Sequence, residues 1–120
     1  MTDNSAHAIN VCTQAGRVRV RFGGEVVADT MRALAFKEGA IPTVLYIPRE
    51  DAAMAYFSPT EHSSHCPFKG DASYYSLSVG ERVVENAVWS YELPLDAAAA
   101  IAGHLAFYAD RVDAIETDGV

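Results

Sequence analysis

The stretch RVRVRFGGEVVADT, residues 17–30, decides the fold class. Val18, Val20 and Phe22 alternate with arginines, and this alternation is typical of a strand that buries one face. The two glycines at 23–24 supply the positive φ angles that a two-residue hairpin turn needs. We therefore expect an antiparallel hairpin here, with EVVADT as its second strand.

Outward from this hairpin, most of the chain is predicted to form further strands. Their segments are rich in alternating, β-branched or aromatic residues: MRALAFKE, TVLYIP, ASYYSLSV and ERVVENAVWSYEL. The segment REDAAMAYF fits either one short helical turn or an irregular connection.

One helix is predicted late in the chain, over LDAAAAIAGHLAFYADRV, residues 95–112. Ile101, Leu105 and Tyr108 recur there at helical spacing. Asp96 is suited to the N-cap of this helix.

The order of these elements predicts the fold. The chain has 120 residues, the usual size of one domain. Many short strands and one late helix predict a mainly β fold with a C-terminal helix (α+β), built as a compact, strongly bent antiparallel sheet or partial barrel. We expect residues 1–16 to form a flexible arm, residues 17–116 the single globular domain, and residues 117–120 a tail.

Composition limits the partners. Nine basic and 16 acidic residues give a net charge of −7, which repels phosphate backbones, so no nucleic-acid partner is expected. The first ten residues lack the features of an export signal, and no apolar run approaches the roughly 20 residues of a membrane span. We therefore expect a cytoplasmic protein without a membrane partner. Its two cysteines, Cys12 and Cys66, are expected to be reduced, although the sequence alone leaves a bridge between them open.

Five motifs carry a resemblance to a known family. In order they are VADTMRALAFKEG, LYIPRED, HCPFKGDASYYS, AVWSYELP and AFYADRVDAIE, within a match from about Val18 to Glu116. The chain resembles the uncharacterised, mostly bacterial family called domain of unknown function 427, which is sometimes labelled nucleotidyltransferase-like. This resemblance implies a fold and a pocket rather than an activity. The sequence has neither a glycine-rich phosphate loop nor a paired acidic motif of the polymerase type.

The stretch TEHSSHCPFKGDASYY, residues 60–75, holds the candidate reactive groups. Cys66 reacts only as a thiolate, which the cationic neighbours His65 and Lys69 would favour, but a buried cysteine is also a common core residue. Lys69 precedes a glycine turn and is placed to meet a carboxylate or phosphate; the alternative is an ordinary surface lysine. A metal site is less favoured, because H-x-x-H-C is not a recognised zinc spacing. Nothing in the sequence indicates a cofactor.

Two carboxylates complete the charged candidates. On the strand LAFKE, Glu38 falls on the same face as Phe36, and a carboxylate on that buried face needs a partner such as Lys69 or Arg49. Such a pair would be either a structural contact or half of an acid–base site. Asp51 is the other candidate, with capping of the following turn as its alternative role.

Aromatic residues on the strands supply candidate pocket walls: Tyr46, Tyr74, Trp89 and Tyr91. Aromatic side chains on strands are mostly core, but they also line small-molecule sites. Tyr74 shares its face with Ala72 and serines, so it is a better pocket candidate than Tyr75.

These residues predict a small-molecule pocket, for an unknown ligand that carries negative charge. Cys66, Lys69 and Glu38 are the candidate catalytic groups, and whether the domain is an enzyme stays open. The alternative is a non-catalytic homodimeric interaction domain, in which exposed strands such as RVRVRF pair edge to edge across a two-fold axis.

Overall fold

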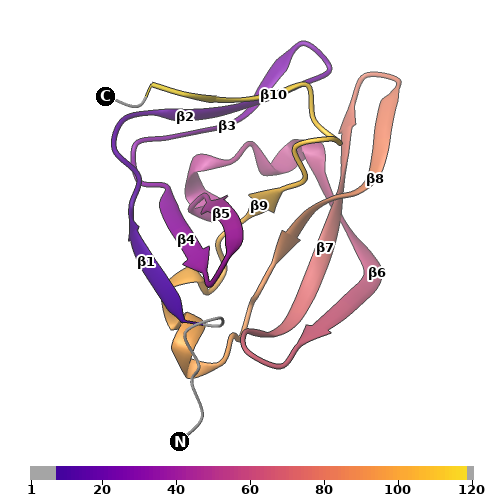
Figure 1. Ribbon diagram of the computed structural model, residues 1–120. Helices are drawn as coiled ribbons and strands as arrows, with labels where there is room; N and C mark the ends of the chain where they lie inside the picture. Colours follow the sequence, from indigo (N-terminus) through magenta and orange to yellow (C-terminus); the bar gives the residue numbers. More distant parts are fainter. Residues whose placement is uncertain (1–7, 119–120) are drawn as a thin grey trace, which may run out of the picture.

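The structure is a computed structural model that describes residues 8–118. Within these residues, ten strands form three antiparallel sheets, and they do not close into a barrel (Figure 1). The strands are β1 (Ile9–Thr13), β2 (Val18–Phe22), β3 (Glu25–Thr30), β4 (Leu34–Glu38), β5 (Ile41–Tyr46), β6 (Phe57–Cys66), β7 (Gly70–Val79), β8 (Arg82–Ser90), β9 (Ala106–Phe107) and β10 (Ala114–Thr117). Three short 3-10 helices connect them: η2 (Arg49–Asp51), η3 (Met54–Tyr56) and η4 (Asp96–Ile101).

The three sheets are separate rather than one strongly bent sheet. Their strand orders are β1-β4-β5, β10-β2-β3 and β6-β7-β8-β9. Two isolated antiparallel pairs lie outside the three sheets, Ala28 with Ala52 and Ile47 with Leu105. The prediction of a mainly β antiparallel domain is thus confirmed.

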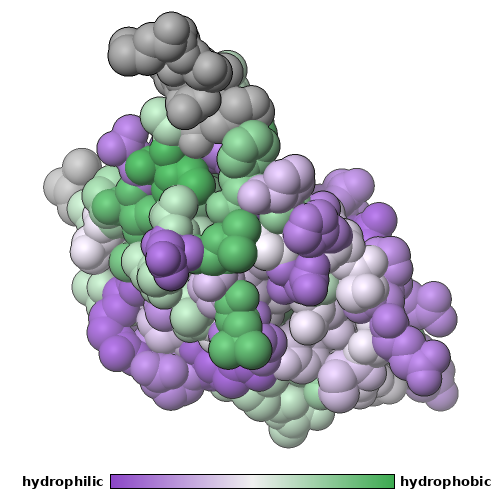
Figure 2. Space-filling view, turned by 90° about the horizontal axis from the view of Figure 1, so that it is seen from below, coloured by the Kyte–Doolittle hydropathy of each residue, from purple (hydrophilic) through white to green (hydrophobic). Residues whose placement is uncertain are grey.

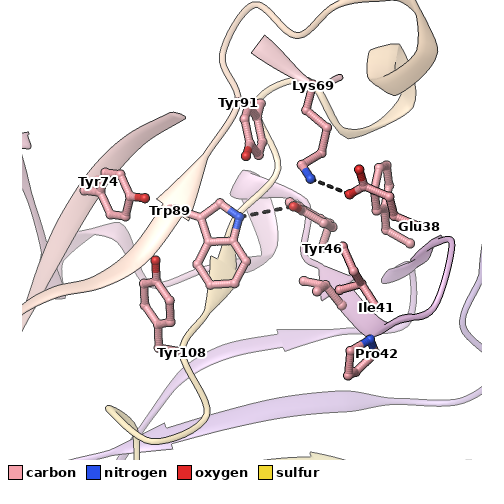
Figure 3. A pocket seen from close by; sticks show the side chains of 11 residues that line it. Glu38, Ile41, Pro42, Tyr46, Lys69, Tyr74, Trp89, Tyr91 and Tyr108 are labelled. Carbon is pink, nitrogen blue, oxygen red and sulfur yellow. Dashed lines mark hydrogen bonds and ion pairs between the residues drawn. The ribbon is translucent and has the colours of Figure 1, made fainter. Parts of the chain in front are cut away.

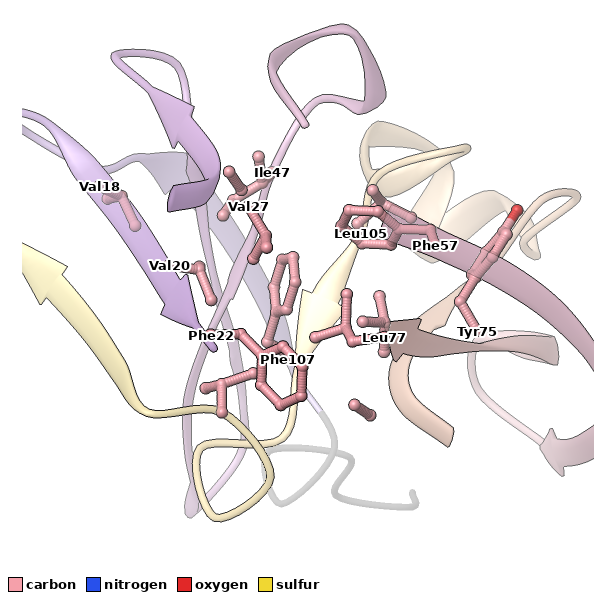
Figure 4. Close-up of a cluster of buried hydrophobic side chains, with 14 of the residues drawn as sticks. Val18, Val20, Phe22, Val27, Ile47, Phe57, Tyr75, Leu77, Leu105 and Phe107 are labelled. Atoms are coloured by element: carbon pink, nitrogen blue, oxygen red, sulfur yellow. The ribbon is translucent and has the colours of Figure 1, made fainter. Parts of the chain in front are cut away.

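The predicted hairpin over residues 17–30 is present as β2 and β3. Its turn glycines have φ angles of 61° and 85°, both in the left-handed region that a Gly-Gly turn permits. The inward side chains Val18, Val20 and Phe22 are fully buried and belong to the larger of two apolar clusters (Figure 4). On the opposite face, Arg17 and Arg19 pair with Asp29 of the neighbouring strand.

A helix over residues 95–112 is not present. Only η4 is helical there, it is kinked at Ala98 with φ of −116°, and its N-cap residue is Leu95 rather than Asp96. The chain then turns at Gly103, whose φ is 70°, and enters β9.

Backbone hydrogen bonding explains why the helix prediction is wrong. The N–H and C=O groups of Leu105 both bond to Ile47 at 2.8 Å, and the Tyr108 N–H donates to the Ala87 carbonyl at 3.0 Å. These bonds satisfy strand groups that burial would otherwise leave unpaired, and they outweigh the modest helix propensity of an alanine run. Ile101 and Leu105 are fully buried, so the pattern identified core side chains but not their backbone conformation.

Three further predictions need correction. The predicted flexible arm is wrong for residues 9–13, which form β1 because β4 offers it an antiparallel partner; residues 1–7 lie outside the described residues. The predicted tail begins one residue early, since Thr117 pairs with Val18 as the last residue of β10, and residues 119–120 are not described. RVRVRF is not an edge, because β2 lies between β10 and β3.

The hairpin turn provides a matched pair of tests. We expect Gly24→Ala to cost about 1–2 kcal/mol of unfolding free energy, from the left-handed backbone alone, since a Cβ there meets nothing within 4 Å. Gly23→Ala should cost more, because its Cβ would lie 2.9 Å from the Cβ of Val79. Urea unfolding of both variants measures the difference, and equal losses would contradict the close contact with Val79.

Candidate functional site

A cavity of about 180 Å³ lies between the β4–β5 hairpin and the strands β7 and β8 (Figure 3). Aromatic side chains form most of its wall: Phe36, Tyr46, Tyr74, Trp89, Tyr91 and Tyr108. Ile41, Pro42 and Val44 of β5 complete the apolar part. The charged part of the lining is Glu38 and Lys69.

Glu38 and Lys69 form a buried ion pair at the cavity wall. The Lys69 Nζ donates to Glu38 Oε1 at 2.5 Å, with only 15% and 6% of the two side chains exposed (Figure 3). The interpretation that Glu38 points inward and pairs with Lys69 is therefore confirmed. The alternative partner, Arg49, instead pairs with Glu92. Its Nη2 donates to both carboxylate oxygens of Glu92, each at 2.7 Å.

The backbone around Lys69 fixes the position of its side chain. Its N–H donates to the carbonyl of Cys66 at 3.3 Å, and its own carbonyl accepts from Leu95 N–H at 2.8 Å. The next residue, Gly70, has a φ of 109°, a conformation that disfavours any side chain, and its α-carbon faces the backbone of residues 93–95. The Lys-Gly sequence thus forms a rigid corner that directs the ammonium group into the cavity.

The electrostatics of the pair keep Lys69 charged. Burial by itself lowers the pKa of Lys69, but the hydrogen bond that Lys69 donates to Glu38 and the nearby Cys66 both raise it. The net result is a pKa above its ordinary value of 10.5. An amine that stays protonated is a hydrogen-bond donor and a positive charge, not a nucleophile.

Three tyrosine hydroxyls around the cavity, those of Tyr46, Tyr91 and Tyr108, also stay protonated. Burial raises the pKa of Tyr46 to about 12, although the hydrogen bond from Trp89 acts against it. Burial likewise raises the pKa of Tyr108 to about 12 and moves that of Tyr91 further above its usual range. At neutral pH the cavity therefore presents O–H and N–H donors within a mostly aromatic wall.

Trp89 is held at the centre of this aromatic wall. Its Nε1–H donates to the Tyr46 hydroxyl at 3.1 Å, and its ring lies 4.5 Å, centre to centre, from that of Tyr108. The Tyr74 hydroxyl is held by Ser64 at 2.8 Å. Rings fixed in this way are suited to stacking against a flat ligand.

Apolar side chains are also exposed beside the cavity. Ile41, which lines it, is 51% exposed, and Phe68, next to Lys69, is 41% exposed. Figure 2, a view of the end of the molecule that carries the β6–β7 turn, shows apolar side chains gathered toward one side and hydrophilic ones over the other. An apolar surface therefore adjoins the cavity.

The structure brings together six of the nine predicted site residues at this cavity: Glu38, Tyr46, Lys69, Tyr74, Trp89 and Tyr91. Cys66 is a free, half-buried thiol that packs against the same aromatic cluster, but it does not line the cavity. Cys12 is exposed and also free.

Two predicted site residues lie elsewhere. His65 is 69% exposed and contacts Asp71 on the neighbouring strand at 2.7 Å. Asp51 accepts hydrogen bonds from Thr30 and Arg32 on a different surface and does not line this cavity. Side chains alternate across a strand, so His65 points away from the side on which its neighbour Cys66 packs against the aromatic cluster.

Sequence reasoning missed five lining residues: Phe36, Ile41, Pro42, Val44 and Tyr108. Phe36 shares the inward face of its strand with Glu38, and Pro42 and Val44 alternate in step with Tyr46, so the period-two pattern was a usable signal. Tyr108 was assigned to the face of a helix that does not form.

Two further features are absent from the described residues. Residues 8–118 hold no cluster of three or more His, Cys, Asp or Glu side chains arranged to bind a metal ion. Nor does that part of the chain contain a helix long and apolar enough to cross a membrane.

Fold and cavity together define a small, mainly β domain with an aromatic cavity that contains one buried ion pair. The chain belongs to the family described as Domain of unknown function (DUF427), whose profile matches residues 10–118. The resemblance seen in the sequence motifs is thus confirmed. No curated protein matches the chain.

The ion pair can be tested by a double-mutant cycle. We expect Glu38→Gln and Lys69→Met each to lower the unfolding free energy by about 3 kcal/mol, because each leaves a buried partner uncompensated. The double variant should lose less than the sum of the two single losses, by roughly 1–3 kcal/mol, in urea unfolding at pH 7.

The stability that the pair contributes should also depend on pH. Since the folded-state pKa of Lys69 is raised, this contribution is complete below the ordinary lysine pKa of 10.5 and is lost as pH rises through the higher folded value.

A surface ion pair is the matched control. Arg17 and Asp29 also meet at 2.7 Å, but their side chains are 44% and 35% exposed. Asp29→Asn should therefore cost less than about 1 kcal/mol. Similar losses at Glu38 and Asp29 would show that the Glu38–Lys69 pair is no more buried than a surface pair.

Proposed function

We propose that the cavity binds a small, flat molecule of about one ring that carries an acceptor oxygen, as a carbonyl or carboxylate does. The observation that carries this proposal is the Lys69 ammonium, held by Glu38 at the wall of an aromatic cavity. One ammonium proton is used by Glu38, which leaves donors for a ligand. The ring of the ligand stacks within the aromatic wall, and its oxygen accepts from Lys69.

The size of the cavity limits the ligand. Its volume of about 180 Å³ is below the roughly 300 Å³ at which sites for drug-sized ligands begin. It is close to the roughly 150 Å³ of an engineered apolar cavity that accommodates benzene. A single six-membered ring with one polar substituent therefore fits.

The charge balance of the cavity defines the polar group. Glu38 already compensates the charge of Lys69, so a neutral carbonyl oxygen fits as well as an anionic one. A cationic ligand would meet the like charge of the Lys69 ammonium, which stays protonated. We therefore favour an acceptor of either charge state over an amine.

Nucleotide transfer, which the family label suggests, is supported less well. A nucleoside triphosphate is much larger than the cavity, and among residues 8–118 only Lys69 contributes a cationic side chain to the lining. Glu38, its lining carboxylate, is already bonded to that lysine. Attack by Cys66 is also disfavoured, because its side chain does not line the cavity. We therefore propose binding of a ring compound and leave the chemistry open.

Trp89 makes binding directly measurable, because it is the single tryptophan of the chain and lines the cavity. We expect benzoate and benzamide to change its fluorescence in a saturable way, and benzylamine to bind at least tenfold more weakly. Lys69→Met should weaken both acceptor ligands about tenfold, the effect of one lost charge-assisted hydrogen bond of roughly 1.5 kcal/mol or more.

Arg21→Met is the control for the change in charge. Arg21 lies on β2 in another sheet and pairs at the surface with Glu116, so its replacement should leave binding unchanged. The proposal fails if neither benzoate nor benzamide binds, or if benzylamine binds as tightly as they do.

A further inference from the structure

A second cavity, of about 320 Å³, meets the first one at Trp89 and Val44, which line both. Its lining, taken over the part of the chain that the structure describes, is almost entirely aliphatic and aromatic, and Thr43 alone adds a hydroxyl group. The Trp89 N–H does not change this character, because it is bonded to Tyr46. The polar and apolar cavities therefore share a wall of two side chains.

The strand β5 separates the two cavities through the ordinary alternation of its side chains. Pro42 and Tyr46 line the first cavity, Thr43 and Leu45 line the second, and Val44 contributes to both. The facing segment alternates in the same way. Tyr108 lines the first cavity, whereas its two neighbours, residues 107 and 109, line the second.

The two segments are hydrogen-bonded at one end only. β5 and β9 lie side by side in Figure 1, and Ile47 and Leu105 form an isolated antiparallel pair between them, with both bonds at 2.8 Å. In a regular antiparallel ladder the next hydrogen-bonded pair would be Leu45 with Phe107, but the pairing does not continue to these residues. Beyond this pair, β5 and β9 face each other without backbone hydrogen bonds. We call this unpaired boundary the seam; it runs beside Trp89, where the two cavities meet.

We propose that the two cavities form one site for a ring compound with an apolar chain. The inference rests on the proposed function and extends it. The ring and its acceptor oxygen occupy the first cavity at Lys69, and the chain passes Val44 and Trp89 along the open seam into the second cavity.

Chemistry favours an apolar chain over a second polar group in this position. The second cavity offers a polar ligand group little beyond the Thr43 hydroxyl, so burying such a group there would leave it without partners. An apolar chain gains free energy in proportion to the area that it removes from water.

A homologous ligand series tests this extension. The probes are benzoate and its 4-alkyl derivatives from methyl to pentyl, titrated against the Trp89 fluorescence of the full chain. Each added methylene that enters the second cavity should tighten binding by about three- to fourfold. The expected result is a stepwise decrease in Kd along the series that levels off when the cavity is full.

Variants that fill the second cavity provide the control. Thr43→Phe and Ala109→Phe place a ring in it from opposite walls, at exposed positions where the fold tolerates a larger side chain. We expect either variant to abolish the dependence on chain length and to leave the Kd of benzoate itself within about twofold. Ala100→Phe, an exposed position on η4 that lines neither cavity, should retain the dependence.

The outcomes separate the two proposals. If benzoate does not bind, the proposed function fails and its extension fails with it. If benzoate binds but the 4-alkyl derivatives bind no more tightly, or if the filled variants keep the dependence on chain length, the shared site is overturned and the first cavity alone remains.

Discussion

The interaction on which the site depends is the buried ion pair between Glu38 and Lys69. It joins β4 of one sheet to the β6–β7 turn of another, and the two side chains are only 6% and 15% exposed. Neither charge is stable in such a position without the other. The surrounding Phe36 and Tyr91 rings lie within 6 Å of the ammonium nitrogen, measured to their centres at 5.7 and 5.9 Å, and add a weaker attraction. The pair therefore both connects two sheets and gives the cavity its polarity.

The division into three sheets has a direct consequence for the position of the cavities. Because the sheets do not close into a barrel, β5 and β9 form no ladder with each other beyond the Ile47–Leu105 pair. A closed barrel would have used those backbone groups in its ladder. The two cavities lie on either side of this seam, so the break in backbone pairing and the open space occur at the same place in the fold.

Local patterns in the sequence predicted much of this structure. Period-two alternation identified the hairpin and the inward carboxylate of Glu38, and the weakly apolar face of Tyr74 distinguished it from Tyr75, which is buried in the larger core. The failures arose where long-range pairing overrides local preference. The alanine run before Gly103 favours a helix, but Leu105 is paired with a residue 58 positions earlier, Ile47, and no local pattern encodes that contact. His65 and Asp51 were grouped with the site by proximity in sequence, which does not specify the direction of a side chain.

The ionisation of Lys69 tests the central claim most directly. The chain has only two lysines, Lys37 and Lys69, so carbon-13 labelling of lysine gives two side-chain signals that can be followed by NMR against pH. We expect one signal to titrate above the ordinary value of 10.5, to disappear in Lys69→Met, and to shift to a lower pKa in Glu38→Gln. Two lysines that both titrate at the ordinary value, and that are unaffected by Glu38→Gln, would contradict the buried pair.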